Sequence, residues 1–337
     1  MASTVLPGAA RPIVAFGPEM PGWGSWEYLG RDLIQELCPY YTTLSFQGDV
    51  VPDCDVAVVV KHLAACACLD DPSSRCRVIY LPVDYFDSCR AIDGEGRILR
   101  KCDRVLVHCH RLTHYFRPYA LTEFLDHPIK HFAPLAQTSE RQKHVVWIGA
   151  RSNLEPVAEW VNRHELPGEL WVLTNFEYPD DPPAPEDFGF RPGAVARMEN
   201  WSPARQQEWL TSARLALDIK GRDFRSHHKP PTKAMEFLAS GVPLAMNAES
   251  SPVEHLADMG FEIAGPDDLE RWQSVEYREE TQRFGNAIRE LCSLERVGRR
   301  LRRIIDKVLA ERSVRPPHCE SSYLYRAPKA EEAPSCS

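Results

Sequence analysis

The sequence predicts an α/β protein with two doubly wound domains, each built on a parallel β-sheet with helices on both faces. Short runs of apolar residues, continuous rather than alternating, recur along the chain with helical patterns between several of them. Strands of this kind are typical of parallel sheets that are buried on both faces. The pattern begins again after a polar segment at residues 135–143, in a chain of 337 residues that is long enough for two domains. We therefore expect two domains that face each other across a cleft.

In the first part of the chain, apolar runs predict a series of strands. The clear candidates lie at residues 12–18, 54–62, 77–84 and 103–109, and a weaker one lies at 128–134. A glycine-rich turn after the first run opens an amphipathic helix, which has Leu29, Leu33 and Leu37 on one face. This alternation predicts a first domain at residues 1–137.

Strand and helix patterns alternate again in the second part. Strands are predicted at 144–150, 169–175 and 214–220, with a short one at 260–265. A helix that starts near Thr232 ends at a glycine and runs into a further apolar strand. The last helical pattern, near 277–312, is unusually long or broken. We expect a second domain at 143–285, a helix at 286–312 that packs back across both domains, and a largely disordered tail at 313–337.

The composition is that of an ordinary soluble globular protein, with 43% apolar and 26% charged residues. No stretch is apolar for long enough to span a bilayer, and the N-terminus has no hydrophobic signal region, so we expect a cytoplasmic protein. The net charge of −8 disfavours broad non-specific binding to nucleic acid. The eleven cysteines include no CxxC pair, and His108, Cys109 and His110 would alternate across a strand. We therefore expect no metal site.

Polar residues gather where the predicted strands of the second domain end, which is where ligands bind in parallel sheets. They are one asparagine, one threonine and several cations: Arg151, Asn175, Lys220, Arg222, Arg225, Lys229, Thr232 and Lys233. So many cations around one helix N-terminus favour a diphosphate, because the free backbone N–H groups there also attract anions. Glu236, one turn inside this helix, is placed to accept hydrogen bonds from ribose hydroxyls. The alternative is that Thr232 simply caps the helix and the lysines are solvated.

The segment at residues 214–256 resembles the donor-binding segment of GT-B glycosyltransferases. It has the family's succession of strand, basic or polar loop, Lys–x–x–Glu helix, Gly–x–Pro turn and strand. The matching positions are Lys233, Glu236, Gly241, Pro243 and, as a looser match, Glu254. The turn at residues 147–151 resembles the family's Gly-x-Arg turn, which maps a phosphate-binding arginine onto Arg151. The resemblance covers most of the chain as a pattern and is specific only around 214–256.

This resemblance implies two Rossmann-like domains, with a nucleotide-sugar donor held by the second and an acceptor held mainly by the first. The implied activity is a glycosyltransferase that needs no metal or other cofactor and moves a sugar from a nucleoside-diphosphate sugar to a hydroxyl group. A UDP-sugar is the first expectation for the donor. The donor-binding residues expected from the residue pattern and the resemblance together are Gly24, Ser25, Arg151, Asn175, Lys220, Arg225, His228, Thr232, Lys233 and Glu236.

If the reaction inverts the anomeric carbon, a base on the first domain must take the proton of the acceptor hydroxyl. Asp84 is the first candidate for this catalytic role, because it comes at the end of the predicted strand at 77–84. Asp87 and Glu27 are held in reserve. A plain turn or cap role for Asp84 is equally open.

One position departs from the family pattern. Many retaining members carry a glutamate eight residues before the ribose-binding one, and His228 stands there in this sequence. This leaves open an inverting enzyme, a retaining enzyme that holds its sugar differently, or a non-catalytic GT-B shell that binds a nucleotide sugar. A further alternative is a phage-type enzyme that glucosylates hydroxymethylated DNA bases, with a basic run along the DNA backbone formed by Arg90, Arg97, Arg100, Lys101 and Arg104. The acceptor stays unassigned among a small molecule, a glycan and a modified DNA base.

Overall fold

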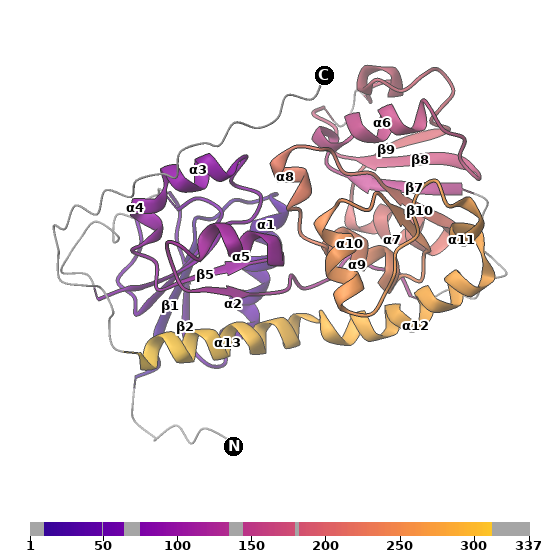
Figure 1. Ribbon diagram of the computed structural model, residues 1–337. Helices are drawn as coiled ribbons and strands as arrows, with labels where there is room; N and C mark the ends of the chain where they lie inside the picture. The colour runs from indigo at the N-terminus through magenta and orange to yellow at the C-terminus, as the bar shows by residue number, and fades with distance from the viewer. Residues whose placement is uncertain (1–9, 49, 64–74, 135–143, 179–181, 312–337) are drawn as a thin grey trace.

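The computed structural model describes residues 10–48, 50–63, 75–134, 144–178 and 182–311. These residues form two lobes, each with a parallel β-sheet at its centre (Figure 1). The sheet of the first lobe has the strand order β2-β1-β3-β4-β5-β6. Its strands are β1 (Ile13–Gly17), β2 (Thr42–Ser45), β3 (Val56–Val60), β4 (Arg77–Leu81), β5 (Arg104–Val107) and β6 (Thr122–Phe124).

The sheet of the second lobe has the order β11-β10-β7-β8-β9, and every pair of neighbouring strands in it is parallel. Its strands are β7 (His144–Gly149), β8 (Glu169–Thr174), β9 (Arg197–Asn200), β10 (Leu215–Asp218) and β11 (Leu244–Met246). The predicted α/β class with two doubly wound domains is therefore confirmed.

Helices connect the strands and cover the sheets. Those of the first lobe are α1 (Gly24–Trp26), the π-helix η1 (Glu27–Arg31), α2 (Asp32–Leu37), α3 (Cys89–Gly94), α4 (Gly96–Leu99) and α5 (His110–Phe116). The second lobe has α6 (Glu155–Val161), α7 (Pro203–Ser212), α8 (Phe224–His227), α9 (Thr232–Ala239), α10 (Ser251–Asp258) and α11 (Leu269–Gln273). Two long helices, α12 (Val275–Leu291) and α13 (Leu294–Ala310), end the described chain.

Strand β3 shows why continuous apolar runs predicted this fold. All five of its residues are buried, and they divide between two cores, one on each face of the sheet. Val56, Val58 and Val60 pack with the predicted leucine face of the first helix, whereas Ala57 and Val59 pack with residues of α3 and α5. Period-2 geometry sends alternate side chains to opposite faces, so both sets must be apolar.

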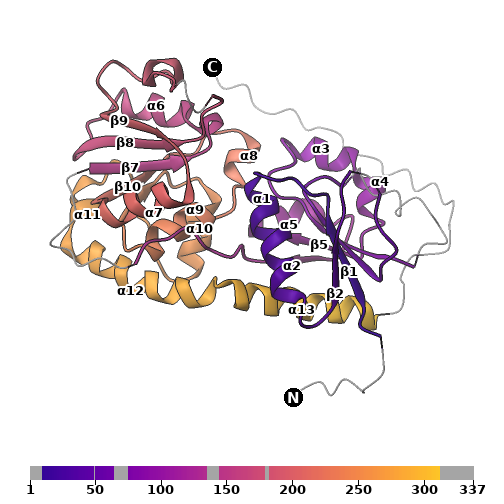
Figure 2. The same ribbon diagram turned by 180° about the vertical axis from the view of Figure 1, so that it is seen from behind.

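The two last helices belong to different lobes, and Figures 1 and 2 show them running along one side of both. Helix α12 packs on α9, and a Cβ at Gly285 would lie only 2.2 Å from the carbonyl oxygen of Leu238, so only glycine allows this approach. Helix α13 packs on α2 and adds Leu301 and Ile305 to the first core. The break falls at Ser293, whose hydroxyl caps α13. The predicted long or broken helix is thus two helices.

Several predicted elements are wrong. Residues 128–134 form no strand; the strand of this region is β6, just before them. Residues 260–265 contribute a single bridge between Ala264 and Ala245 rather than a strand. Strands β2 and β9 were missed because their residues are only partly buried or exposed, so they carry no apolar signal. The predicted linker at 135–143 and tail at 313–337 lie outside the described residues.

Arg104 does not belong to a basic surface. Its side chain is buried, with the guanidinium held by Glu123 and by both carboxylate oxygens of Glu311 at the end of α13. This arginine therefore fastens α13 to the first sheet, and the basic run predicted to lie along a DNA backbone loses one of its members.

Among the helices that the structure describes, none combines the length and apolar character required to traverse a bilayer.

Candidate functional site

Four predicted residues of the second lobe, three cations and one asparagine, form what we call the strand-end group. Arg151, Asn175 and Lys220 follow β7, β8 and β10, and Lys233 lies in the first turn of α9. The backbone N–H of Arg151, after β7, donates to Asn175 Oδ1 after β8 at 3.0 Å. The guanidinium of Arg151 is half exposed and pairs with Glu177 at 2.6 Å. Lys220, after β10, pairs with the buried Asp218 at 2.7 Å. Arg151 and Lys220 are thus held by acidic neighbours and remain near the surface.

Helix α9 begins at Thr232 with two prolines before it, and no side chain caps its first turn. The alternative, a plain cap role for Thr232, is not what the structure has, because Thr232 Oγ1 lies 3.1 Å from His127 Nδ1 of the first lobe. Lys233 points inward, with its ammonium 3.3 Å from Gln206 Oε1 and 3.7 Å from Glu236 Oε2. Burial lowers the pKa of Lys233, and the nearby carboxylates of Glu236 and Asp218 oppose that effect.

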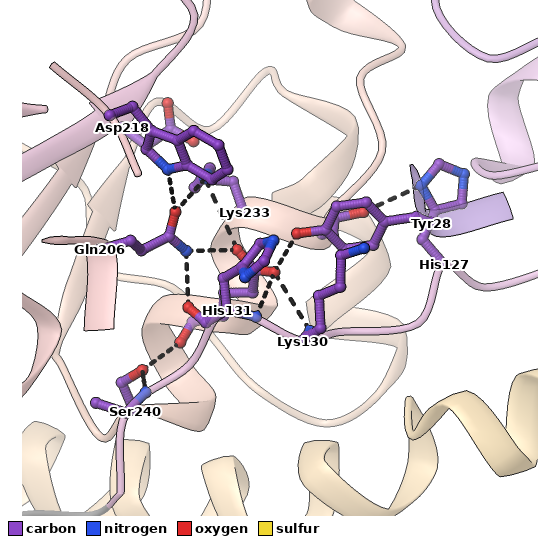
Figure 3. A network of polar contacts seen from close by, with 12 residues as sticks. Tyr28, His127, Lys130, His131, Gln206, Asp218, Lys233 and Ser240 are labelled. Atoms are coloured by element: carbon purple, nitrogen blue, oxygen red, sulfur yellow. Dashed lines mark hydrogen bonds and ion pairs between the residues drawn. The ribbon is translucent and has the colours of Figure 1, made fainter. Parts of the chain in front are cut away.

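Glu236 is the centre of a buried network rather than an open ribose acceptor. Figure 3 shows its partners Tyr28, His131 and Gln206 pointing toward one another. The side chain of Glu236 is 1% exposed. Oε1 accepts from the hydroxyl of Tyr28 at 2.6 Å and from the backbone N–H groups of His131 and Lys130 at 3.2 and 3.4 Å. Oε2 accepts from the amide of Gln206 at 2.8 Å. Ribose recognition by Glu236 stays a prediction, and a ribose hydroxyl could reach Oε1 only by displacing a partner from the chain itself.

This network joins the two lobes. Tyr28 lies on the π-helix η1 of the first lobe, and π-helical turns are often found at functional sites. The ammonium of Lys130 lies 4.4 Å from the centre of its ring and pairs with Asp32 at 2.6 Å. Burial opposes ionisation of Glu236, but Lys233 and the bonds from Tyr28 and Gln206 outweigh it, so the pKa of Glu236 lies below its usual value.

A second group of charges spans the cleft, and we call it the bridging cluster: Lys61, Asp84, Arg225 and Lys229. Lys61 follows β3 and Asp84 follows β4, both in the first lobe. Lys229 precedes α9, and its ammonium lies 3.3 Å from Asp84 Oδ2. Arg225, on α8, donates to the carbonyl of Tyr85 at 3.5 Å. Asp84, the predicted base, is thus at the cleft and paired with a cation of the opposite lobe.

Asp84 also has a left-handed backbone conformation and a side-chain oxygen that accepts no hydrogen bond from the described residues. Its φ is +50°, a left-handed value that costs an ordinary residue about 1–3 kcal/mol and is found most often at functional sites. Its Oδ1 is buried and has no hydrogen-bond partner among the described residues. Burial favours the neutral acid, but Lys229, His108 and Lys61 outweigh it and hold the pKa of Asp84 below its usual value.

Two histidines lie beside this cluster, His108 of the first lobe and His228 of the second. His108 Nε2 lies 2.7 Å from the carbonyl oxygen of His228, so Nε2 carries the proton and donates. Its Nδ1 is buried without a partner among the described residues. His228 itself, at the position of the family's missing glutamate, turns its Nδ1 to the carbonyl of Phe224 at 2.6 Å. Burial lowers the pKa of both His108 and His228, so both rings favour the neutral form.

The remaining predicted residues lie apart from these contacts. Gly24 and Ser25 begin α1, where Gly24 is exposed and Ser25 Oγ is buried without a described partner. Glu254 pairs with Arg111 of the first lobe at 2.6 Å, a further contact across the cleft. The reserve acids Glu27 and Asp87 bond to their helix or turn neighbours Arg31 and Ser88. No group of three or more potential metal ligands occurs in the described ranges.

Sequence reasoning missed several residues of the site, and their signals differ. Lys61 and His108 lie near the ends of the predicted strands at 54–62 and 103–109, so the same rule that selected Asp84 would have selected them. Tyr28 and Gln206 lie within helical segments, and no local pattern marks them. Their contacts with Glu236 can be recognised only in the folded protein, where α9, α7 and the first helix lie close together.

Comparison with solved structures gives the fold a family context. AviGT4, a glycosyltransferase of avilamycin A biosynthesis, matches with a TM-score of 0.60 at 12% identity, over 89% of this chain and 98% of its own. Sucrose-phosphate synthase from Thermosynechococcus elongatus gives 0.61 at 11% identity, over 89% and 99%. An alpha-glucosyltransferase in complex with UDP and a DNA containing an HMU base gives 0.53 at 10% identity, over 90% and 100%.

No family model matches the sequence, and a search of curated proteins finds no match either. The structural matches nevertheless extend over nearly the full length of these glycosyltransferases, and both lobes have the parallel sheets described above. The chain has the GT-B fold.

Proposed function

We propose that this protein is a glycosyltransferase that moves a sugar from a nucleoside-diphosphate sugar, with UDP as the first candidate nucleotide, to a hydroxyl acceptor. The observation that carries the proposal is the position of the strand-end group, at the carboxyl ends of the second sheet beside the N-terminus of α9. A helix N-terminus with several cations is suited to a diphosphate. One protein of the same fold, the glucosyltransferase on HMU-containing DNA, was crystallised with UDP.

The chemistry has two requirements. The leaving diphosphate must be stabilised, for which Arg151, Lys220 and Lys233 supply positive charge without a metal. The acceptor hydroxyl must lose its proton, and Asp84 is our candidate base, since its Oδ1 is buried and has no partner among the described residues. In the unliganded state Lys229 pairs with the other oxygen of Asp84. An anionic substrate that binds near Lys229 would compete for its ammonium and leave Asp84 freer to act as a base.

A thermal-shift panel of UDP, GDP, ADP, CDP and dTDP tests the donor site, because a ligand that binds only the folded state raises its melting temperature. The test variant is Arg151→Ala, and the matched control is Arg163→Ala. Both arginines are exposed and pair with an exposed glutamate, so either loss costs little stability. Loss of a charge-assisted bond to phosphate should weaken binding about 10- to 100-fold in Arg151→Ala only.

The outcomes separate the candidate functions. No shift with any nucleotide, in a folded protein, would refute the donor site. A shift without hydrolysis or transfer of the matching nucleotide sugar would indicate a non-catalytic shell. Turnover that Asp84→Asn reduces by a factor of about 100 or more, with nucleotide binding kept, would support Asp84 as the base. The buried Arg104 gives no support to the DNA-modifying alternative.

A further inference from the structure

Lys61 is held in a strained conformation at the cleft. It follows β3 with φ +69°, and its backbone is fixed on both sides, since its N–H donates to Leu81 O at 2.9 Å and its carbonyl accepts from the Tyr80 hydroxyl at 2.8 Å. A positive φ outside glycine persists only where the surroundings enforce it. The ammonium lies 4.3 Å from the centre of the Trp23 ring and forms no ion pair with a carboxylate of the described residues.

The bridging cluster contains more positive than negative charge. Lys61, Arg225 and Lys229 contribute three cations, and Asp84 contributes the one carboxylate, which leaves a net charge of +2. Partial burial lowers the pKa of Lys61, and the charges of Lys229 and Arg225 lower it further, against the opposing effect of Asp84. Cations that repel one another in a partly buried place are stabilised by an added anion.

The cluster has an aromatic surface beside it. Trp23 is 53% exposed although it is a large apolar side chain, and it precedes the glycine-rich start of α1. The half-buried rings of His62 and Tyr85, which follow Lys61 and Asp84 in sequence, lie edge to face with their centroids 5.2 Å apart. Exposed aromatic faces next to a few fixed polar groups are typical of small-ligand sites.

We propose that the bridging cluster and Trp23 bind an acceptor carrying a phosphate monoester, a sugar phosphate, whose phosphate lies among Lys61, Lys229 and Arg225 and whose ring packs on Trp23. This proposal rests on the proposed function, because it names the acceptor of the same reaction. A phosphate monoester near pH 7 carries a charge of about −1.5 to −2, which balances the net +2 of the cluster. A carboxylate would balance only half of it. The donor diphosphate has its own cations in the strand-end group, namely Arg151, Lys220 and Lys233.

Calorimetry with glucose 6-phosphate, glucose and glucuronate as probes, with the preferred nucleoside diphosphate present and absent, tests the proposal. The test variant Lys61→Met keeps the apolar stem and removes the charge. The control Lys307→Met removes an exposed lysine of α13 that pairs with Glu123. We expect glucose 6-phosphate to bind at least ten times more tightly than glucose or glucuronate, and Lys61→Met to lose about 10- to 100-fold of this affinity. Nucleotide binding should stay unchanged in both variants.

A second variant guards against a folding defect in Lys61→Met. Trp23 is exposed, so Trp23→Ala should fold normally and weaken glucose 6-phosphate binding while the nucleotide response persists. The proposal is overturned if glucuronate or glucose binds as tightly as glucose 6-phosphate, or if both variants keep wild-type affinity for it. It is also overturned if Lys61→Met loses nucleotide binding, since the cluster would then serve the donor. Nucleotide binding without any response to glucose 6-phosphate would leave the proposed function standing and refute only the phosphorylated acceptor.

Discussion

The hydroxyl of Tyr28 should stabilise the joint between the lobes, and Tyr28→Phe removes this hydroxyl alone. In the wild type it donates to Glu236 Oε1 at 2.6 Å, in a place where the carboxylate is almost fully buried. Hydrogen bonds to charged groups contribute about 1.5–3 kcal/mol. The lower half of this range is the better expectation, because the backbone N–H groups of Lys130 and His131 still bond to the same oxygen.

Calorimetric melting measures this effect. With an unfolding entropy of about 2 cal/mol/K per residue, a protein of this size should lose about 2–3 °C of melting temperature for such a change. The matched control is Tyr40→Phe, because Tyr40 is exposed and its hydroxyl has no hydrogen-bond partner among the described residues. That variant should melt within about 1 °C of the wild type. If Tyr28→Phe had the same melting temperature as the control, the hydrogen bond would make no net contribution to stability, and the joint between the lobes would depend on apolar packing alone.

Two pH dependences follow from the buried charges. The folded protein lowers the pKa of His127 from 6.5 to about 3 by burial, so between these values the unfolded chain binds more protons and stability falls as the pH falls. Between pH 6.5 and pH 5 this histidine should lower the free energy of unfolding by about 2 kcal/mol. The variant His127→Asn should therefore lose less stability on acidification than the wild type, whereas His114→Asn, at an exposed histidine, should behave like the wild type. Lys229→Met should raise the pKa of Asp84, because it removes the largest influence that opposes burial, and so move the acid limb of kcat/KM to higher pH. An unmoved acid limb would assign it to another group than Asp84.

The sequence predicts the architecture well because continuous apolar strands such as β3 leave a strong local pattern. It also locates the edge of the second sheet, since Arg151, Lys220 and Lys233 all follow or face strand ends. It does not predict which partner each polar residue meets. Glu236 and Tyr28 are 208 residues apart in the chain, and their contact depends on how the lobes are placed together. The contact of Thr232 could not be predicted for the same reason, because its partner His127 comes from the other lobe.

The Tyr28 hydroxyl already donates to the Glu236 carboxylate, so the same Tyr28→Phe variant can test ribose recognition by Glu236. If a ribose hydroxyl bonds to Glu236 Oε1, it must displace the Tyr28 hydroxyl, and part of the binding energy is lost in that exchange. Removal of the hydroxyl should then tighten UDP binding by several-fold to about tenfold even as the free protein becomes less stable. Pyrophosphate has no ribose, so its affinity should not change in the variant. UDP affinity that stays equal or weakens would assign Glu236 to the joint between the lobes alone, and ribose recognition would then belong to other groups at the carboxyl ends of the second sheet.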